Sequence, residues 1–85
     1  MTCLHMVSSL PTSSAFQRAI NSVRSGDTLL LCDDAVYAAE LPSINNVLVM
    51  QQCVQARGIE SPFELADYQT MVDLVCQHEK QIQWG

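Results

Sequence analysis

Charged residues are scarce in this chain, and basic residues are the scarcest of them. Charged residues make up 15% of the 85 residues, whereas about a quarter is usual for a soluble domain. Lys and Arg together number four, and the net charge is −5. Because nucleic-acid binding depends on neutralising phosphates, so few and scattered cations argue against direct binding of RNA or DNA. The low charge also predicts that part of the surface is covered in an oligomer.

Long apolar runs are also missing. No run approaches the ~18 residues of a membrane span, and the N-terminal segment 1–5 lacks the basic region and apolar core of a secretion signal. We therefore expect a cytoplasmic protein with no membrane contact, whose cysteines stay reduced. The four cysteines lie far apart in the chain, so there is no CxxC pair and no zinc-ligand spacing. No metal or other cofactor is expected.

Apolar residues, 48% of the chain, fall into segments that alternate between strand-like and helix-like spacing. Strands are expected at Cys3–Val7, Thr28–Cys32, Val47–Met50, Phe63–Leu65 and Ile82–Trp84. The first helix is expected to begin after a Ser13 or Ser14 cap and to stop at Ser25–Gly26. Further helices are expected at Ala35–Ala39, at Gln52–Arg57 ending on Gly58, and at Tyr68–His78. Leu41–Pro42–Ser43 should break the chain between the second helix and the third strand. This alternation predicts one small α/β domain over residues 1–85, with a parallel, Rossmann-like sheet of four or five strands flanked by helices.

The strand Thr28–Cys32 is continuously apolar and runs directly into Asp33 and Asp34. A continuous apolar strand is typical of a parallel sheet covered on both faces, and such sheets place their sites at the carboxyl ends of the strands. The two carboxylates could form an acid/base pair or bind Mg²⁺. The simpler interpretation is that one of them caps the helix that follows.

Two cysteines are candidate thiols. Cys32 stands where a site would be, but the neighbouring acids should raise its pKa and suppress the thiolate. Cys53 is the better thiol, since it lies near the start of a helix with Arg57 one turn later. We therefore expect Cys53 to be alkylated fastest at neutral pH. Cys3 and Cys76 are expected to be small buried hydrophobes. His5 is expected to be a core or subunit-contact residue and not a ligand.

Several motifs occur in a recognisable order. The segment 26–39 contains an apolar strand, two acids and Val-Tyr-Ala-Ala, and the other stretches are Leu4-His5, Ala56-Arg57-Gly58-Ile59, Asp67-Tyr68, Val72-Asp73-Leu74, His78 and Trp84. Together they cover nearly the whole chain and resemble the DsrH/TusB family of small sulfur-relay subunits, within the DsrE/DsrF/DsrH-like superfamily.

The resemblance implies a non-catalytic subunit of a TusBCD-like heterohexamer, with TusC-like and TusD-like (DsrF/DsrE-like) partners, that supports 2-thiolation of the tRNA wobble uridine. DsrH proteins of sulfur oxidisers carry a cysteine in the first helix, and the matching residue here is Ala19, which cannot carry a persulfide. Three alternatives stay open: a sulfurtransferase that carries persulfide on Cys53 or Cys32, a subunit of a DsrEFH-type sulfur-oxidation complex, and a self-assembling homo-oligomer.

Four residues are candidates for subunit contacts: Asp34, Tyr37, Tyr68 and Trp84. Aromatic residues with a polar tip are favoured in interfaces, and Trp84 needs a packing partner because it stands near the end of the chain.

Overall fold

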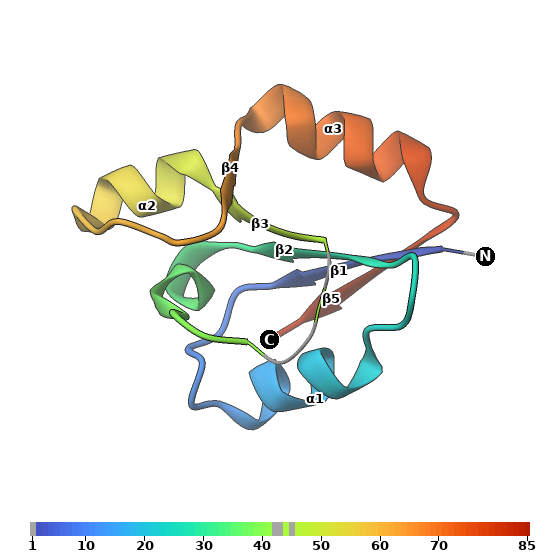
Figure 1. Cartoon of the computed structure of the whole chain (residues 1–85), viewed down its shortest axis with the longest axis horizontal. Helices are drawn as coiled ribbons and strands as arrows, with labels where there is room; N and C mark the ends of the chain where they lie inside the picture. Colours follow the sequence, from blue (N-terminus) through green and yellow to red (C-terminus); the bar gives the residue numbers. More distant parts are fainter. Residues whose placement is uncertain (1, 42–43, 45) are drawn as a thin grey trace.

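One five-stranded, all-parallel sheet organises the molecule, as the sequence predicts (Figure 1). The computed structural model describes residues 2–41, 44 and 46–85, so Pro42 and Ser43 of the predicted helix break lie outside the described residues. The strand order is β4-β3-β2-β1-β5, which places the first and last strands side by side. The strands are β1 (Cys3–Val7), β2 (Thr28–Leu31), β3 (Val47–Met50), β4 (Glu64–Ala66) and β5 (Lys80–Trp84).

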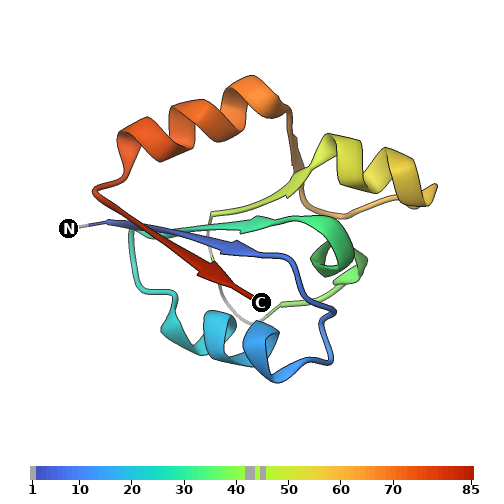
Figure 2. The same cartoon turned by 180° about the vertical axis from the view of Figure 1, so that it is seen from behind.

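Helices cover both faces of the sheet (Figures 1 and 2). The helix α1 (Ser14–Ser22) and the short 3-10 helix η1 (Asp33–Tyr37) lie on one face. The helix α3 (Tyr68–Gln77) lies on the other. The helix α2 (Gln51–Arg57) lies at the carboxyl end of the sheet against η1, and its buried residue Val54 packs with the residues under α1. No helix within the described ranges is long and apolar enough to cross a membrane.

The helix ends show how local sequence sets the elements. Ser13 caps α1, because its hydroxyl accepts a hydrogen bond from the Phe16 amide at 3.1 Å. Gly58 ends α2 in the left-handed conformation, with φ of 63°. Both caps were predicted. The helix α1 nevertheless ends at Ser22, before the predicted stop, and the Gly26 turn (φ 89°) follows separately.

The two faces of the sheet are packed to different extents. The face under α1, called the α1 face, contains one cluster of buried residues: Val7, Phe16, Ala19, Leu29, Leu31, Ala35, Val36, Ala38, Val49 and Val54. The opposite face, called the α3 face, contains a smaller cluster: Leu4, Leu30, Met50 and Ala66. The helix α3 lays Met71, Leu74 and Val75 on this smaller cluster, as the sequence predicts, but contributes no fully buried residue.

Two cysteine predictions need correction at this point. Cys76 is exposed on α3 and is not a buried hydrophobe, because α3 lies on the sheet without a second layer over its outer side. Cys3 is half-buried, since it begins the strand β1 at the rim of the sheet.

Candidate functional site at the carboxyl edge of the sheet

The carboxyl ends of β2 and β3 bring both candidate thiols to one place. Cys32 follows β2 directly, and Cys53 lies in the first turn of α2, which begins straight after β3. The Cys53 thiol is 3.9 Å from Oδ1 of Asp33. A hollow of about 490 Å³ opens beside Cys32 and Asp33, between Met71 of α3 and the ends of β1 and β5. The structure therefore has a hollow at the edge where parallel sheets place their sites.

The predicted capping role of the two acids is wrong. The residue that precedes η1 is Cys32, and no side chain caps this helix. The Ala35 amide is satisfied instead by the Cys32 carbonyl at 3.0 Å. Asp33 adopts a left-handed backbone with φ of 48° and accepts from the Cys53 thiol. Asp34 turns outward to Arg57.

Arg57 ties η1 to α2. Its Nη2 donates to Oδ1 of Asp34 at 3.0 Å, and its guanidinium lies 5.9 Å from the centre of the Tyr37 ring. The hydrogen bond and charge of Asp34 raise the pKa of Arg57. Towards Cys53, Arg57 reaches only the backbone carbonyl, at 3.3 Å. The hydrogen bonds of Arg57 thus go to a carboxylate and to a backbone carbonyl.

The environment of Cys32 opposes thiolate chemistry. Burial, followed by the nearby Cys53 and Asp33, raises the pKa of the Cys32 thiol to about 11. At neutral pH only about one Cys32 in ten thousand would then be ionised. The predicted effect of the neighbouring acid is therefore confirmed, although burial is the larger cause.

No metal site accompanies these groups. Among residues 2–41, 44 and 46–85, no three His, Cys, Asp or Glu side chains lie together in a way that could hold an ion. Asp33 and Asp34 point to different neighbours, as adjacent residues at a strand end are expected to do, so they do not form a shared carboxylate pair.

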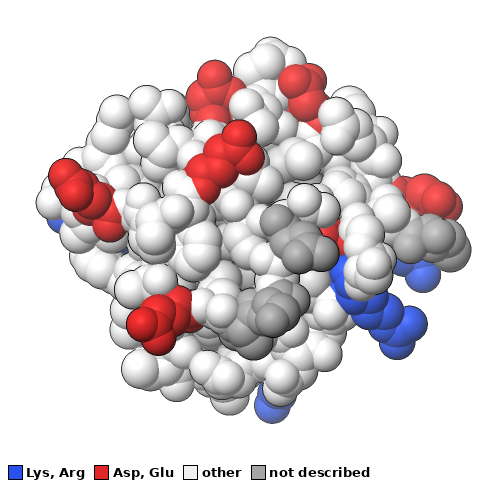
Figure 3. Space-filling view, viewed as in Figure 1, with Lys and Arg blue, Asp and Glu red and all other residues white. Residues whose placement is uncertain are grey.

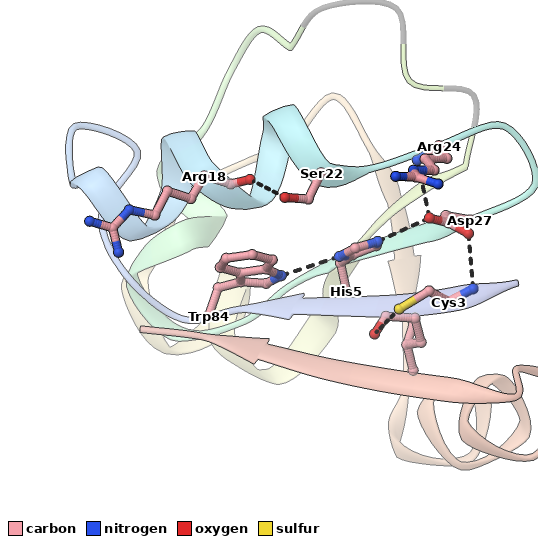
Figure 4. Close-up of polar contacts among 8 residues, drawn as sticks. Cys3, His5, Arg18, Ser22, Arg24, Asp27 and Trp84 are labelled. Atoms are coloured by element: carbon pink, nitrogen blue, oxygen red, sulfur yellow. Dashed lines mark hydrogen bonds and ion pairs between the residues drawn. The ribbon is translucent and has the colours of Figure 1, made fainter.

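A second polar cluster lies on the α1 face (Figure 4). Trp84 Nε1 donates to Nδ1 of His5 at 3.2 Å, and the His5 Nε2 is 3.0 Å from Oδ2 of Asp27. Since an indole N–H can only donate, Nδ1 of His5 must accept, and Nε2 carries the proton that is donated to Asp27. The imidazole is therefore the neutral Nε2–H tautomer, as expected for a core histidine.

Asp27 is the anchor of this cluster. It also accepts from the backbone amides of Cys3 at 2.9 Å and Arg24 at 3.1 Å. Burial by itself would raise the pKa of Asp27, but the hydrogen bonds from His5 and the two amides outweigh it, so the pKa is lowered. Burial, and then the charge of Asp27, raise the pKa of Cys3. The sequence marked Asp27 only as part of a turn, since its partners come from distant positions.

The four predicted contact residues lie in or next to segments at the carboxyl ends of strands. Tyr37 and Tyr68 are 48% and 62% exposed, and Asp34 is exposed beside Arg57. Trp84 is half-buried, with its ring 6.2 Å from that of His5 and tilted by 21°. Of the four, Tyr68 is the most exposed, whereas Asp34 and Tyr37 also contact Arg57.

The all-parallel sheet with helices on both faces places this chain in the class of small Rossmann-like α/β domains. The family described as "DsrH like protein" matches residues 8–81. Protein TusB of Pectobacterium parmentieri is 32% identical over 94 aligned residues, which cover 95% of this chain and 99% of that protein. The chain belongs to the DsrH family, and this membership supports a role in sulfur relay.

Proposed function

We propose that residues 1–85 form one DsrH/TusB-like domain that acts as a non-catalytic subunit of a cytoplasmic, TusBCD-like sulfur-relay complex. Its partners would be TusC-like and TusD-like subunits, and the complex would support 2-thiolation of the tRNA wobble uridine. The observation that carries this proposal is the likeness to Protein TusB along nearly the whole of both chains. The complex would hold the RNA through another subunit, because this chain has only four basic residues.

The state of the thiols supports a non-catalytic role. A sulfur carrier needs a thiolate, which cationic neighbours or a helix N-terminus normally supply. Here Cys32 is half-buried, and desolvation raises the pKa of its thiol to about 11. Ala19 stands where the resemblance places the cysteine of sulfur oxidisers. It is fully buried against the sheet, so even a cysteine there would have little access to a donor.

The low charge and exposed apolar side chains of the surface support the proposal that other subunits cover part of this chain. In the view of Figure 3, basic side chains appear at the lower right and also at the bottom and left edges, acidic ones are dispersed, and wide uncharged areas separate them. Several large apolar side chains are exposed, among them Leu65, Tyr68 and Tyr37. We propose that the carboxyl edge, with Asp34, Tyr37, Tyr68 and the nearby Trp84, meets a neighbouring subunit and shapes the pocket of that neighbour's thiol.

The pathway and the partners can be tested in the source organism. The affinity-tagged chain, purified gently, should bring down the two related subunits in equal amounts, as weighed by native mass spectrometry. Deletion of its gene should lower 2-thiouridine in tRNA hydrolysates, and the plasmid-borne chain should restore it. Intact 2-thiouridine after deletion would contradict the tRNA role, and a loss of sulfur oxidation instead would favour the DsrEFH-type alternative.

A further inference from the structure

The two edges of the sheet differ in how open they are to another strand. The edge strand β4 has three residues, begins with Glu64 and follows Pro62 by one residue. Short strands, charges and prolines are the usual means of blocking an edge. The other edge strand, β5, has five residues, and four of them are exposed, including Ile82 at 38%. It carries a single charge, on Lys80 at its first position.

The hydrogen bonds of β5 fix which backbone groups point outward. The Trp84 carbonyl accepts from the Ser8 amide at 3.2 Å, and Trp84 pairs with Val7 in the parallel register. In a parallel ladder the N–H and C=O of one residue point to the same side. Trp84 and, two residues earlier, Ile82 therefore direct their backbone groups to β1. The N–H and C=O groups of Gln81 and Gln83 point away from the sheet.

A groove runs beside this edge on the α1 face. It has a volume of about 540 Å³ and is lined by three alternate residues of β5, namely Lys80, Ile82 and Trp84, and by residues near the end of α1. Successive side chains of a strand point to opposite faces, so the side chains of an added strand that face this way would enter the groove.

From these features we infer that β5 pairs antiparallel with β5 of a second copy of this chain, about a two-fold axis at Ile82. In this register Gln81 lies opposite Gln83 of the other copy, and such a pair exchanges both backbone hydrogen bonds. The outward groups of both glutamines are thereby satisfied. Ile82 then meets its own counterpart in the closer, non-hydrogen-bonded type of pair, with both side chains in the grooves.

The charges fit the same register. Lys80 lies opposite Trp84 of the other copy, and an ammonium group over an indole ring is a favourable cation–π pair. The hydrogen bond from Trp84 to His5 holds that ring in place. No like charges face one another along the strand pair. A parallel or shifted pairing would lose both the Lys80–Trp84 and the Ile82–Ile82 contacts. The sequence of β5 is thus complementary to itself in this one register, which favours a second copy as the occupant.

The pairing is smaller than the standard interface of about 1,600 Å², so we expect a dimer that forms as concentration rises. The test is amide hydrogen exchange by NMR on the full purified chain between about 10 µM and about 1 mM. The Gln81 and Gln83 amides should become protected with concentration, whereas the Ile82 amide, already bonded to β1, should not change. A chain that sediments as a monomer throughout, or a dimer without this protection, would overturn the inference.

Two pairs of variants locate the contact. Gln83→Pro removes an outward amide without touching the bonds to β1, and should weaken dimerisation about tenfold or more, whereas Gln83→Ala should not. Ile82→Glu sets two like charges against each other, and Leu65→Glu on β4 is its matched control at the other edge. Both glutamate variants alter an exposed residue, so folding should survive, as checked by circular dichroism. Dimers that persist in Ile82→Glu, or are lost equally in Leu65→Glu, would contradict the pairing.

Discussion

The α1 face and the α3 face of the same sheet show two ways in which a small domain covers its strands. On the α1 face, α1 and η1 bury a continuous apolar cluster and enclose the network of Asp27, His5 and Trp84. On the α3 face, a helix with no fully buried residue rests on four buried ones. We expect the first face, with its larger buried cluster, to contribute more to the stability of the chain. The second leaves surface that a partner subunit could cover.

The largest effect on the free energy of unfolding should come from a Leu→Ala substitution, and it should differ between the two faces. Leu31→Ala removes a fully buried side chain from the α1 face and should lower the free energy of unfolding by about 2–5 kcal/mol. Leu74→Ala removes a half-buried side chain of α3 and should cost about 1 kcal/mol, because little cavity is left. Urea denaturation followed by circular dichroism measures both. Equal losses would show that the faces contribute alike.

Acid should act mainly through Asp27 on the α1 face. Because folding lowers the pKa of Asp27, its stabilisation is present above about pH 4 and is lost as the pH falls through the lower pKa of the folded state. Asp27→Asn should cost about 1–3 kcal/mol at pH 7 and flatten the fall in stability below about pH 4. Glu40→Gln, at an exposed site, removes the same charge as a control and should keep the slope of the parent chain.

A smaller loss of stability should follow when only the indole N–H donor of Trp84 is removed. Trp84→Phe keeps an aromatic ring beside His5 but removes the hydrogen bond to Nδ1, which should cost about 1 kcal/mol. The ¹⁵N shifts of His5 should show the Nε2–H tautomer in the parent chain and a mixture of tautomers in the variant. A mixture already present in the parent chain would contradict the network.

The smallest effect on stability is expected at the candidate interface. Tyr68 is 62% exposed at the start of α3, so Tyr68→Ala should change the free energy of unfolding by no more than about 0.5 kcal/mol. The same variant should weaken assembly with the proposed partner subunits, measured by co-purification. The control is Gln69→Ala, one residue further along the same helix. A large loss of stability in Tyr68→Ala would place this residue in the fold and not in a contact.

Features set by near neighbours could be predicted from the sequence, and those set by distant contacts could not. The Ser13 and Gly58 caps depend on residues within one turn, and both were predicted. The positions of the Asp33 and Asp34 side chains are set by Cys53 and Arg57, which lie far along the chain, so the capping prediction failed.

Sheet order shows the same limit. The apolar run of β2 predicts a buried central strand, and Leu29, Leu30 and Leu31 are all fully buried. Nothing local indicates that β5 lies against β1, which is what brings Trp84 to His5. The exposed position of Cys76 was missed for a related reason. The apolar spacing of α3 shows that one side of the helix packs on the sheet, but not whether anything covers its other side.

The central proposal, that this chain assists sulfur relay without carrying sulfur, is tested most directly by transfer of labelled persulfide sulfur through the proposed three-subunit complex, reconstituted from its purified chains. Cys32→Ala and Cys53→Ala versions of this chain should each transfer sulfur at the rate of the parent complex, with assembly verified by native mass spectrometry. Loss of transfer in either variant, with the complex intact, would contradict the claim and make that cysteine a carrier.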